Sequence, residues 1–154
     1  MTIRPLTVFD AFDMAELEKA CFSLPWSLES VKSELQNPNA LYPGAFIGGK
    51  LAGYAGMQMI LDEGYITNLA TAPAHRRKGI AGALMRELLS AAAERKLRFI
   101  TLEVRESNLP ARGLYEKHGF APAGTRKGYY DLPKEDAILM TREFFAVTPC
   151  IEKD

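Results

Sequence analysis

YITNLATAPAHRRKGIAGALMRE, which runs from Tyr65 to Glu87, is the stretch that decides the fold of this chain. Its first seven residues are rich in strand-forming side chains, and Pro73 then removes a backbone donor and ends the strand. From Ile80 onward the apolar residues recur at helical spacing. The three cations at 76–78 stand just before the helix N-terminus, where unpaired N–H groups carry partial positive charge. The stretch therefore predicts a strand, an anion-binding turn and a helix, with phosphate or pyrophosphate as the natural ligand.

Two better-known phosphate-binding loops do not match this turn. A Walker loop requires GxxxxGK followed by Ser or Thr, and a dinucleotide fingerprint requires GxGxxG. The run here is Gly79-Ile80-Ala81-Gly82. What remains is the pattern R-x-x-G-x-A at Arg76, Gly79 and Ala81. A surface turn with a solvated basic patch would give the same letters, so the loop alone does not decide the function.

Composition limits the classes of protein that this sequence can encode. The chain has 154 residues, with 19 Lys plus Arg and 19 Asp plus Glu. We expect one domain over residues 1–147 and a short tail at 148–154. Balanced charge gives no global field for nucleic acid or membrane, and no stretch has the apolar length of a membrane span. The N-terminal residues do not resemble a signal peptide, so we expect a cytoplasmic protein, monomeric or weakly dimeric.

The cysteines and histidines do not predict a metal centre or a nucleophile. Cys21 and Cys150 are far apart in sequence, and we expect both to be free thiols. His75 and His118 have no metal-ligand spacing with each other or with a cysteine. We therefore expect no metal.

The remaining periodicity predicts a mixed α/β fold. Gly48-Gly49 between two strand patterns is a hairpin signal, and Asn108 and Gly119 bracket a late helix. A helix joins the strands at 65–71 and 99–104, so these two strands should be parallel. The predicted order is βααβββαβαββ, with strand 3–5, helices 7–21 and 27–35, strands 45–47, 51–61 and 65–71, helix 80–96, strand 99–104, helix 108–118 and strands 121–130 and 137–142.

A second motif, LEVRESNLPARGLYEKHGF from Leu102 to Phe120, points to a known family. Together with the R-x-x-G-x-A loop, it resembles the GNAT family of N-acetyltransferases. The resemblance covers about residues 3–142 and is closer still to the RimI-type ribosomal-protein-alanine N-acetyltransferases. The segments that match this branch are Pro25-Trp26-Ser27, Asn68-Leu69-Ala70, Leu102–Asn108, Tyr129-Tyr130 and Glu135-Asp136-Ala137. One departure is Leu109–Gly113, where family members are often rich in alanine.

The resemblance implies the GNAT acyl-CoA N-acyltransferase fold, with splayed central parallel strands, and acetyl-CoA as co-substrate. It implies acetyl transfer to a protein N-terminus, that of a small-subunit ribosomal protein beginning with alanine. By resemblance, Glu103 is the general base and Tyr115 the general acid. Without the resemblance, Glu103 could be a rim carboxylate that pairs with a cation such as Arg105, and Tyr115 could be a packed aromatic.

The resemblance also assigns the binding residues. Residues that would contact the cofactor are Leu69, Ala70, Thr71, Arg77, Lys78, Gly79, Ile80, Ala81, Gly82 and Asn108. Residues that would border the acceptor groove are Trp26, Tyr129, Tyr130 and Asp136. Asn108 could also be a plain helix cap, and Trp26 a core aromatic. Two other functions stay open: acetylation of a small amine such as a polyamine or an antibiotic, and acyl-CoA binding without catalysis.

Overall fold

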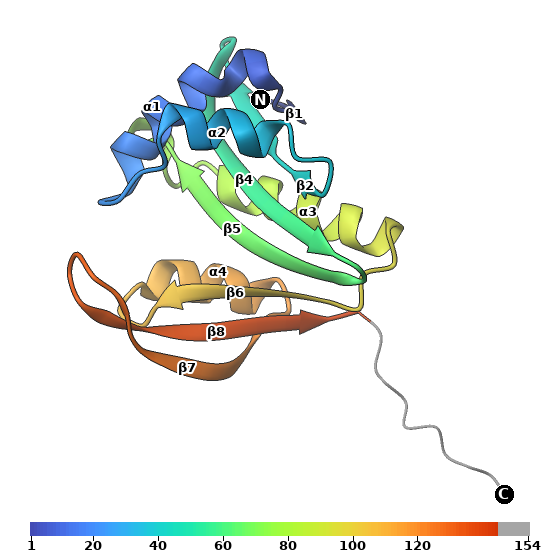
Figure 1. Ribbon diagram of the computed structural model, residues 1–154, viewed down its shortest axis with the longest axis vertical. Helices are drawn as coiled ribbons and strands as arrows, with labels where there is room; N and C mark the ends of the chain where they lie inside the picture. Colours follow the sequence, from blue (N-terminus) through green and yellow to red (C-terminus); the bar gives the residue numbers. More distant parts are fainter. Residues whose placement is uncertain (145–154) are drawn as a thin grey trace, which may run out of the picture.

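The computed structural model describes residues 1–144 and shows a mixed sheet covered by helices on both faces (Figure 1). The N-terminal half contains β1 (Thr2–Pro5), a 3₁₀ turn (Val8–Asp10), α1 (Ala11–Cys21), α2 (Leu28–Leu35), β2 (Ala40–Leu41), β3 (Pro43–Ile47), β4 (Lys50–Ile60) and β5 (Glu63–Thr71). After a second 3₁₀ turn (Pro73–His75) come α3 (Ile80–Glu94), β6 (Phe99–Arg105), α4 (Leu109–Lys117), β7 (Ala121–Tyr130) and β8 (Glu135–Glu143).

The sheet has the order β1-β3-β4-β5-β6-β8-β7, with β2 paired to β4. Its neighbouring strands are antiparallel except β5 and β6, which α3 connects as a crossover. This arrangement confirms the predicted parallel pair and the predicted mixed sheet.

The parallel pair is short, and this shortness creates the site. β5 and β6 are in register only at Glu63–Phe99, Gly64–Ile100 and Tyr65–Thr101. Beyond these pairs, β5 continues beside β4 alone and β6 beside β8, so the two strands diverge (Figure 1). The splayed central strands implied by the resemblance are therefore present.

Two apolar clusters hold the helices on opposite faces of the sheet. Met14 of α1 and Val31 of α2 are fully buried in one cluster, together with Tyr54 of β4. The other cluster contains Leu84 and Leu88 of α3 and extends to residues of α4. In Figure 1, α1 and α2 accordingly lie in front of the sheet and α3 behind it.

Local sequence signals act where they were predicted. Asn108 caps α4 by accepting a hydrogen bond from the Ala111 N–H at 3.2 Å, and Ser27 caps α2 through the Ser30 N–H at 3.1 Å. Gly48 and Gly49 have φ angles of 58° and 79°, which only glycine adopts easily and which the tight β3–β4 hairpin requires. These positions fix the ends of elements on which the site is built.

The structure differs from the predicted elements in small ways. β2 was not predicted, because a strand of two residues carries no periodicity. α3 ends at Glu94 rather than Lys96, since Lys96 has a left-handed backbone, with φ of 57°. The predicted tail at 148–154, with Cys150, lies outside the described residues. Among residues 1–144, no helix is long and apolar enough to cross a membrane.

Candidate active site

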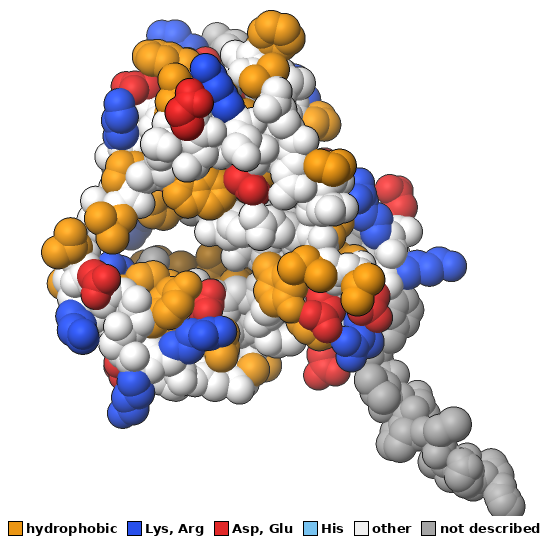
Figure 2. Space-filling model, in the orientation of Figure 1, with side chains coloured by type: hydrophobic (Ala, Val, Ile, Leu, Met, Phe, Trp, Pro, Cys, Tyr) orange, Lys and Arg blue, Asp and Glu red, His pale blue; other side chains and the backbone are white. Residues whose placement is uncertain are grey.

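A cavity of about 580 Å³ opens where β5 and β6 diverge. In the space-filling view, a gap passes between the upper and lower halves of the molecule at this place (Figure 2). The lining comes from five parts of the chain: Glu18 of α1 with residues 21–24 and Trp26 after it, residues 66–69 of β5, residues 102–105 of β6, Asn108, Ala111 and Tyr115 at α4, and residues 129–132.

Glu103 projects into this cavity from the diverging end of β6. Its carboxylate forms an ion pair with the Arg126 guanidinium, with Oε2 and Nε 2.7 Å apart, and accepts a hydrogen bond from the Tyr129 hydroxyl at 3.4 Å. The side chain is 27% exposed, so an incoming ligand can reach it. Arg105, the cation considered from the sequence, pairs instead with Glu135 at 3.3 Å.

Tyr115 reaches the same cavity from α4. It is 7% exposed, and its ring packs against Phe120 with centroids 5.8 Å apart. Burial raises the pKa of its phenol, so the hydroxyl keeps its proton at neutral pH. Tyr115 is therefore a packed aromatic that also lines the cavity, and its role as general acid stays a prediction.

The turn before α3 contains two residues with a left-handed backbone. Gly79 precedes the first residue of the helix with φ of 79°, and Arg77 has φ of 64°. A Cβ built on Gly79 would meet no atom within 4 Å, so the space in front of the helix N-terminus is open. The second 3₁₀ turn separates this turn from β5, and the Arg76 side chain connects it to that strand by donating a hydrogen bond to the Thr71 carbonyl at 3.3 Å.

The residues assigned to the cofactor fall in three places: the cavity lining, the end of β5, and the turn with the start of α3. Leu69 and Asn108 line the cavity, and Asn108 is also the cap of α4, so both of its proposed roles are compatible. Ala70 and Thr71 continue along β5 away from the cavity lining, and residues 77–82 form the turn and the start of α3. Residues 72–76, which include the second 3₁₀ turn, separate Thr71 from this group.

Three of the four residues assigned to the acceptor groove line the cavity. Tyr129 and Tyr130 stack edge to face with centroids 5.0 Å apart, and Arg105 lies 4.4 Å from the centre of the Tyr130 ring. Burial raises the pKa of Tyr130 to about 12. Trp26 both lines the cavity and packs edge-on against Tyr42. Asp136 lies outside the lining, and its carboxylate accepts a hydrogen bond from the Gly128 N–H at 2.7 Å within the β7–β8 hairpin.

Several residues of the cavity wall, Glu18 and Asn68 among them, were not predicted as site residues. Glu18 is 1% exposed, and burial raises the pKa of its carboxyl while hydrogen bonds from Trp26 and Asn68 oppose the shift. The available signal was its position inside the apolar stripe of α1, between Met14 and Cys21. Among the described residues, no group of three or more His, Cys, Asp or Glu side chains could hold a metal ion.

Comparison with known proteins agrees with this geometry. The model of the acetyltransferase (GNAT) family matches residues 11–120, so the chain belongs to the GNAT family. The ribosomal protein bS18-alanine N-acetyltransferase of Escherichia coli K12 is 35% identical over 141 residues, covering 90% of this chain and 95% of that protein. The N-alpha-acetyltransferase RimI of Mycobacterium tuberculosis is 37% identical over 149 residues, covering 93% and 92%.

A solved structure supports the same relationship. The crystal structure of the ribosomal-protein-S18-alanine N-acetyltransferase from Escherichia coli superposes with a TM-score of 0.89 at 32% identity. The match covers 99% of each chain. The fold and the RimI-type resemblance inferred from the sequence motifs are therefore confirmed.

Proposed function

We propose that this protein transfers the acetyl group of acetyl-CoA to the N-terminal α-amine of a protein, the N-terminal alanine of a small-subunit ribosomal protein. The observation that carries this proposal is the cavity between β5 and β6, which Glu103 and Tyr115 enter from different elements. Relatives that match nearly the whole chain bear the corresponding name. The reaction would take place in the cytoplasm, where ribosomal proteins are made.

Acetyl-CoA fits the residues present along one edge of the cavity. From Ile66 to Thr71, β5 has no partner strand on its β6 side, so its backbone can bond the amides of an extended ligand. The turn at 77–82 offers open space, cations and unpaired helix N–H groups for a pyrophosphate. The cofactor would supply a thioester carbonyl open to attack by an amine.

The protein residues would then move two protons. Glu103 accepts a proton from the attacking amine, directly or through a water molecule. Its Arg126 partner is 56% exposed at the surface, so the carboxylate can exchange this ion pair for a cationic acceptor. Tyr115 donates its phenolic proton to the departing sulfur, and the raised pKa of its hydroxyl keeps that proton available.

The choice of an α-amine over a lysine side chain follows from protonation. A free α-amine has a pKa of about 7.7–8.0, against about 10.4 for lysine. At neutral pH roughly a tenth of α-amines are uncharged, but only about one lysine in 2,500. A single carboxylate base such as Glu103 therefore needs much less free energy to deprotonate an α-amine than to deprotonate a lysine side chain.

The test compares three acceptors with acetyl-CoA. The first is an alanine-initiated peptide, the second is the same peptide blocked at its N-terminus and carrying a lysine, and the third is spermidine. We expect mass spectrometry to place the acetyl group on the α-nitrogen of the first peptide. Faster acetylation of spermidine would favour a small-amine acetyltransferase. Binding of acetyl-CoA with no turnover on any acceptor would favour a non-catalytic module.

A further inference from the structure

A buried carboxylate forms part of the cavity wall on the α1 side. Glu18 accepts hydrogen bonds from the Trp26 backbone N–H at 2.9 Å, from Asn68 Nδ2 at 2.9 Å and from the Tyr54 hydroxyl. Within residues 1–144, no cation forms a salt bridge with it. Burial raises the pKa of this carboxyl, and the hydrogen bonds that converge on it act against that rise by stabilising its ionised form. The proton-transfer steps proposed above do not use Glu18.

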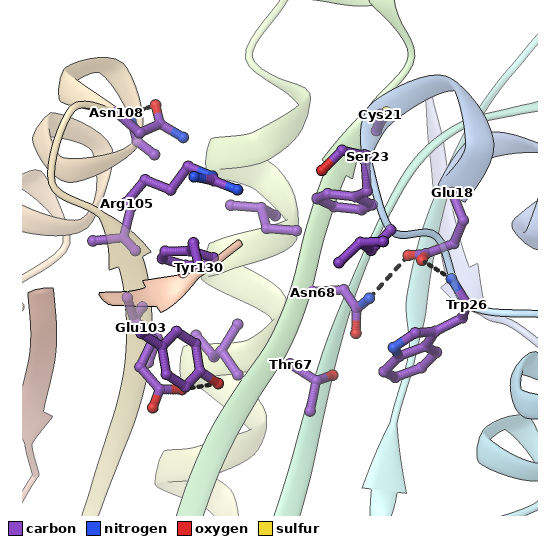
Figure 3. A pocket seen from close by; sticks show the side chains of 18 of the residues that line it. Glu18, Cys21, Ser23, Trp26, Thr67, Asn68, Glu103, Arg105, Asn108 and Tyr130 are labelled. Atoms are coloured by element: carbon purple, nitrogen blue, oxygen red, sulfur yellow. Dashed lines mark hydrogen bonds between the residues drawn. The ribbon is translucent and has the colours of Figure 1, made fainter. Parts of the chain in front are cut away.

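The hydrogen bond to Glu18 fixes the direction of the Asn68 amide. A carboxylate only accepts, so the Asn68 NH₂ group must face Glu18 and the carbonyl oxygen must face away from it. Figure 3 shows this arrangement, with the amide nitrogen toward Glu18 and the oxygen turned away. Asn68 Oδ1 is buried and has no hydrogen-bond partner among the described residues. A buried acceptor without a donor is rare in folded proteins and calls for an explanation.

The position of Asn68 suggests which ligand supplies that donor. Asn68 lines the cavity and projects toward α1, as does Ala70, which packs in the α1–α2 cluster. Leu69 between them packs in the opposite cluster, which contains α3. The turn proposed for the cofactor precedes α3 on that opposite face. Asn68 therefore faces the side of the sheet opposite α3, the side to which Glu18 and Trp26 also belong.

We propose that Asn68 is a positioning residue for the acceptor, whose first residue donates an N–H to Oδ1, and that Glu18 fixes the amide for this contact. The inference rests on the proposed function, because it takes the acceptor to be a peptide N-terminus. The α-amine and the first peptide N–H of such a chain are the donors available. The negative charge of Glu18 behind the amide also favours a cationic chain end. The oxygen is closed to solvent, so binding includes a small adjustment of the wall.

The substitution Glu18→Gln tests the direction of the amide rather than its presence. The carbonyl of the new glutamine would keep the hydrogen bond from the Trp26 N–H, which leaves the glutamine NH₂ group facing Asn68 and the Tyr54 hydroxyl. A hydroxyl can accept as well as donate, whereas the Asn68 NH₂ group can only donate. Asn68 must then turn its oxygen to that NH₂ group and its own NH₂ toward the acceptor, where two donors repel. We expect the KM for the alanine-initiated peptide to rise about tenfold, with kcat and the KM for acetyl-CoA nearly unchanged.

The double substitution Glu18→Gln with Asn68→Asp restores a hydrogen-bond acceptor on the cavity side of residue 68. One oxygen of the new carboxylate accepts from the introduced glutamine, and the other takes the place of the original Oδ1. The peptide KM should return to within about threefold of the parent, which loss of packing at residue 18 would not allow. Glu16→Gln is the matched control, because Glu16 lies on the same helix, is exposed and pairs with Lys19 at the surface.

Thermal unfolding of each variant establishes that it is folded. If Glu18→Gln does not fold, Asn68→Ala removes the oxygen directly and should raise the peptide KM by a similar factor. An unchanged peptide KM in the folded single variant, or a double variant no better than the single one, overturns the inference. Failure of the parent enzyme to acetylate the peptide would instead refute the proposed function, so the two failures are distinguishable.

Discussion

At the scale of single residues, Glu103 and Tyr115 occupy contrasting environments that suit opposite proton transfers. Glu103 is partly exposed and forms an ion pair with Arg126, so an incoming acceptor could reach its carboxylate. Tyr115 is buried, and burial raises the pKa of its phenol, which is the environment of a group that keeps its proton until it donates it. The two environments separate the proposed base from the proposed acid.

The prediction at this scale concerns turnover. Glu103→Gln removes the basic oxygen and Tyr115→Phe removes the acidic proton, each with little change of shape. We expect each substitution to lower kcat by ~10²–10⁴-fold, because loss of a general acid or base has that effect. Calorimetry should find acetyl-CoA affinity close to that of the parent in both. Turnover within a few-fold of the parent in both variants would show that Glu103 and Tyr115 are not the general base and the general acid.

Sequence motifs predicted these residues, but not their partners. Glu103, Asn108 and Tyr115 were found because each stands at a fixed place in one continuous segment, and all three line the cavity. Arg126 of β7 pairs with Glu103 of β6 across the intervening strand β8, and Glu18 contacts Asn68, which lies 50 residues away in the sequence. Such contacts depend on how elements pack, and residue spacing along the chain does not contain that information.

At the scale of elements, the turn between β5 and α3 is the proposed binding site for the pyrophosphate of acetyl-CoA. Gly79 has φ of 79° and open space around a built Cβ. A side chain there would project into the volume in which a pyrophosphate would approach the helix N–H groups. Gly49 in the β3–β4 hairpin has the same φ and the same open surroundings. A substitution at Gly49 therefore serves as a control for the backbone strain that a substitution at Gly79 causes.

We predict that Gly79→Val weakens acetyl-CoA binding at least about tenfold, while Gly49→Val leaves it unchanged. Both substitutions place a β-branched residue in a left-handed conformation, so both should lower the free energy of unfolding by similar amounts. Isothermal calorimetry on the folded variants separates the two effects. Equal affinities for acetyl-CoA in the two variants would show that the turn does not hold the pyrophosphate.

The predictability of elements followed the strength of their local signals. Helix caps and the glycine hairpin were located correctly because one residue type satisfies one backbone requirement at each position. The strand β2 was not predicted because its two residues are too few to show a periodic pattern. Asp136 was assigned to the groove by resemblance, yet the β7–β8 hairpin directs its carboxylate to the Gly128 N–H. Side-chain direction in a hairpin depends on register, which the sequence alone left open.

At the scale of the whole molecule, the protein consists of two halves of one sheet that separate around the cavity. Only three residue pairs join β5 to β6, whereas β4 and β5 are paired along most of their lengths. The proposed cofactor path runs along the free edge of β5 and reaches Asn108 at the start of α4, beyond β6. A ligand on this path contacts both halves and replaces the missing strand-to-strand contacts. Its binding energy should therefore add to the stability of the whole domain.

The last prediction follows from this linkage. A ligand that binds only the folded state at a hundred times its Kd raises the free energy of unfolding by about 2.7 kcal/mol. For a domain of this size, that gain corresponds to a rise in Tm of roughly 5–10 °C. We expect acetyl-CoA to produce this shift in the parent protein, and hydrogen exchange to slow on both β5 and β6. Gly79→Val at the same acetyl-CoA concentration should shift less, in proportion to its weaker binding. Slower exchange confined to one half of the sheet would mean that the ligand does not bridge the diverging strands.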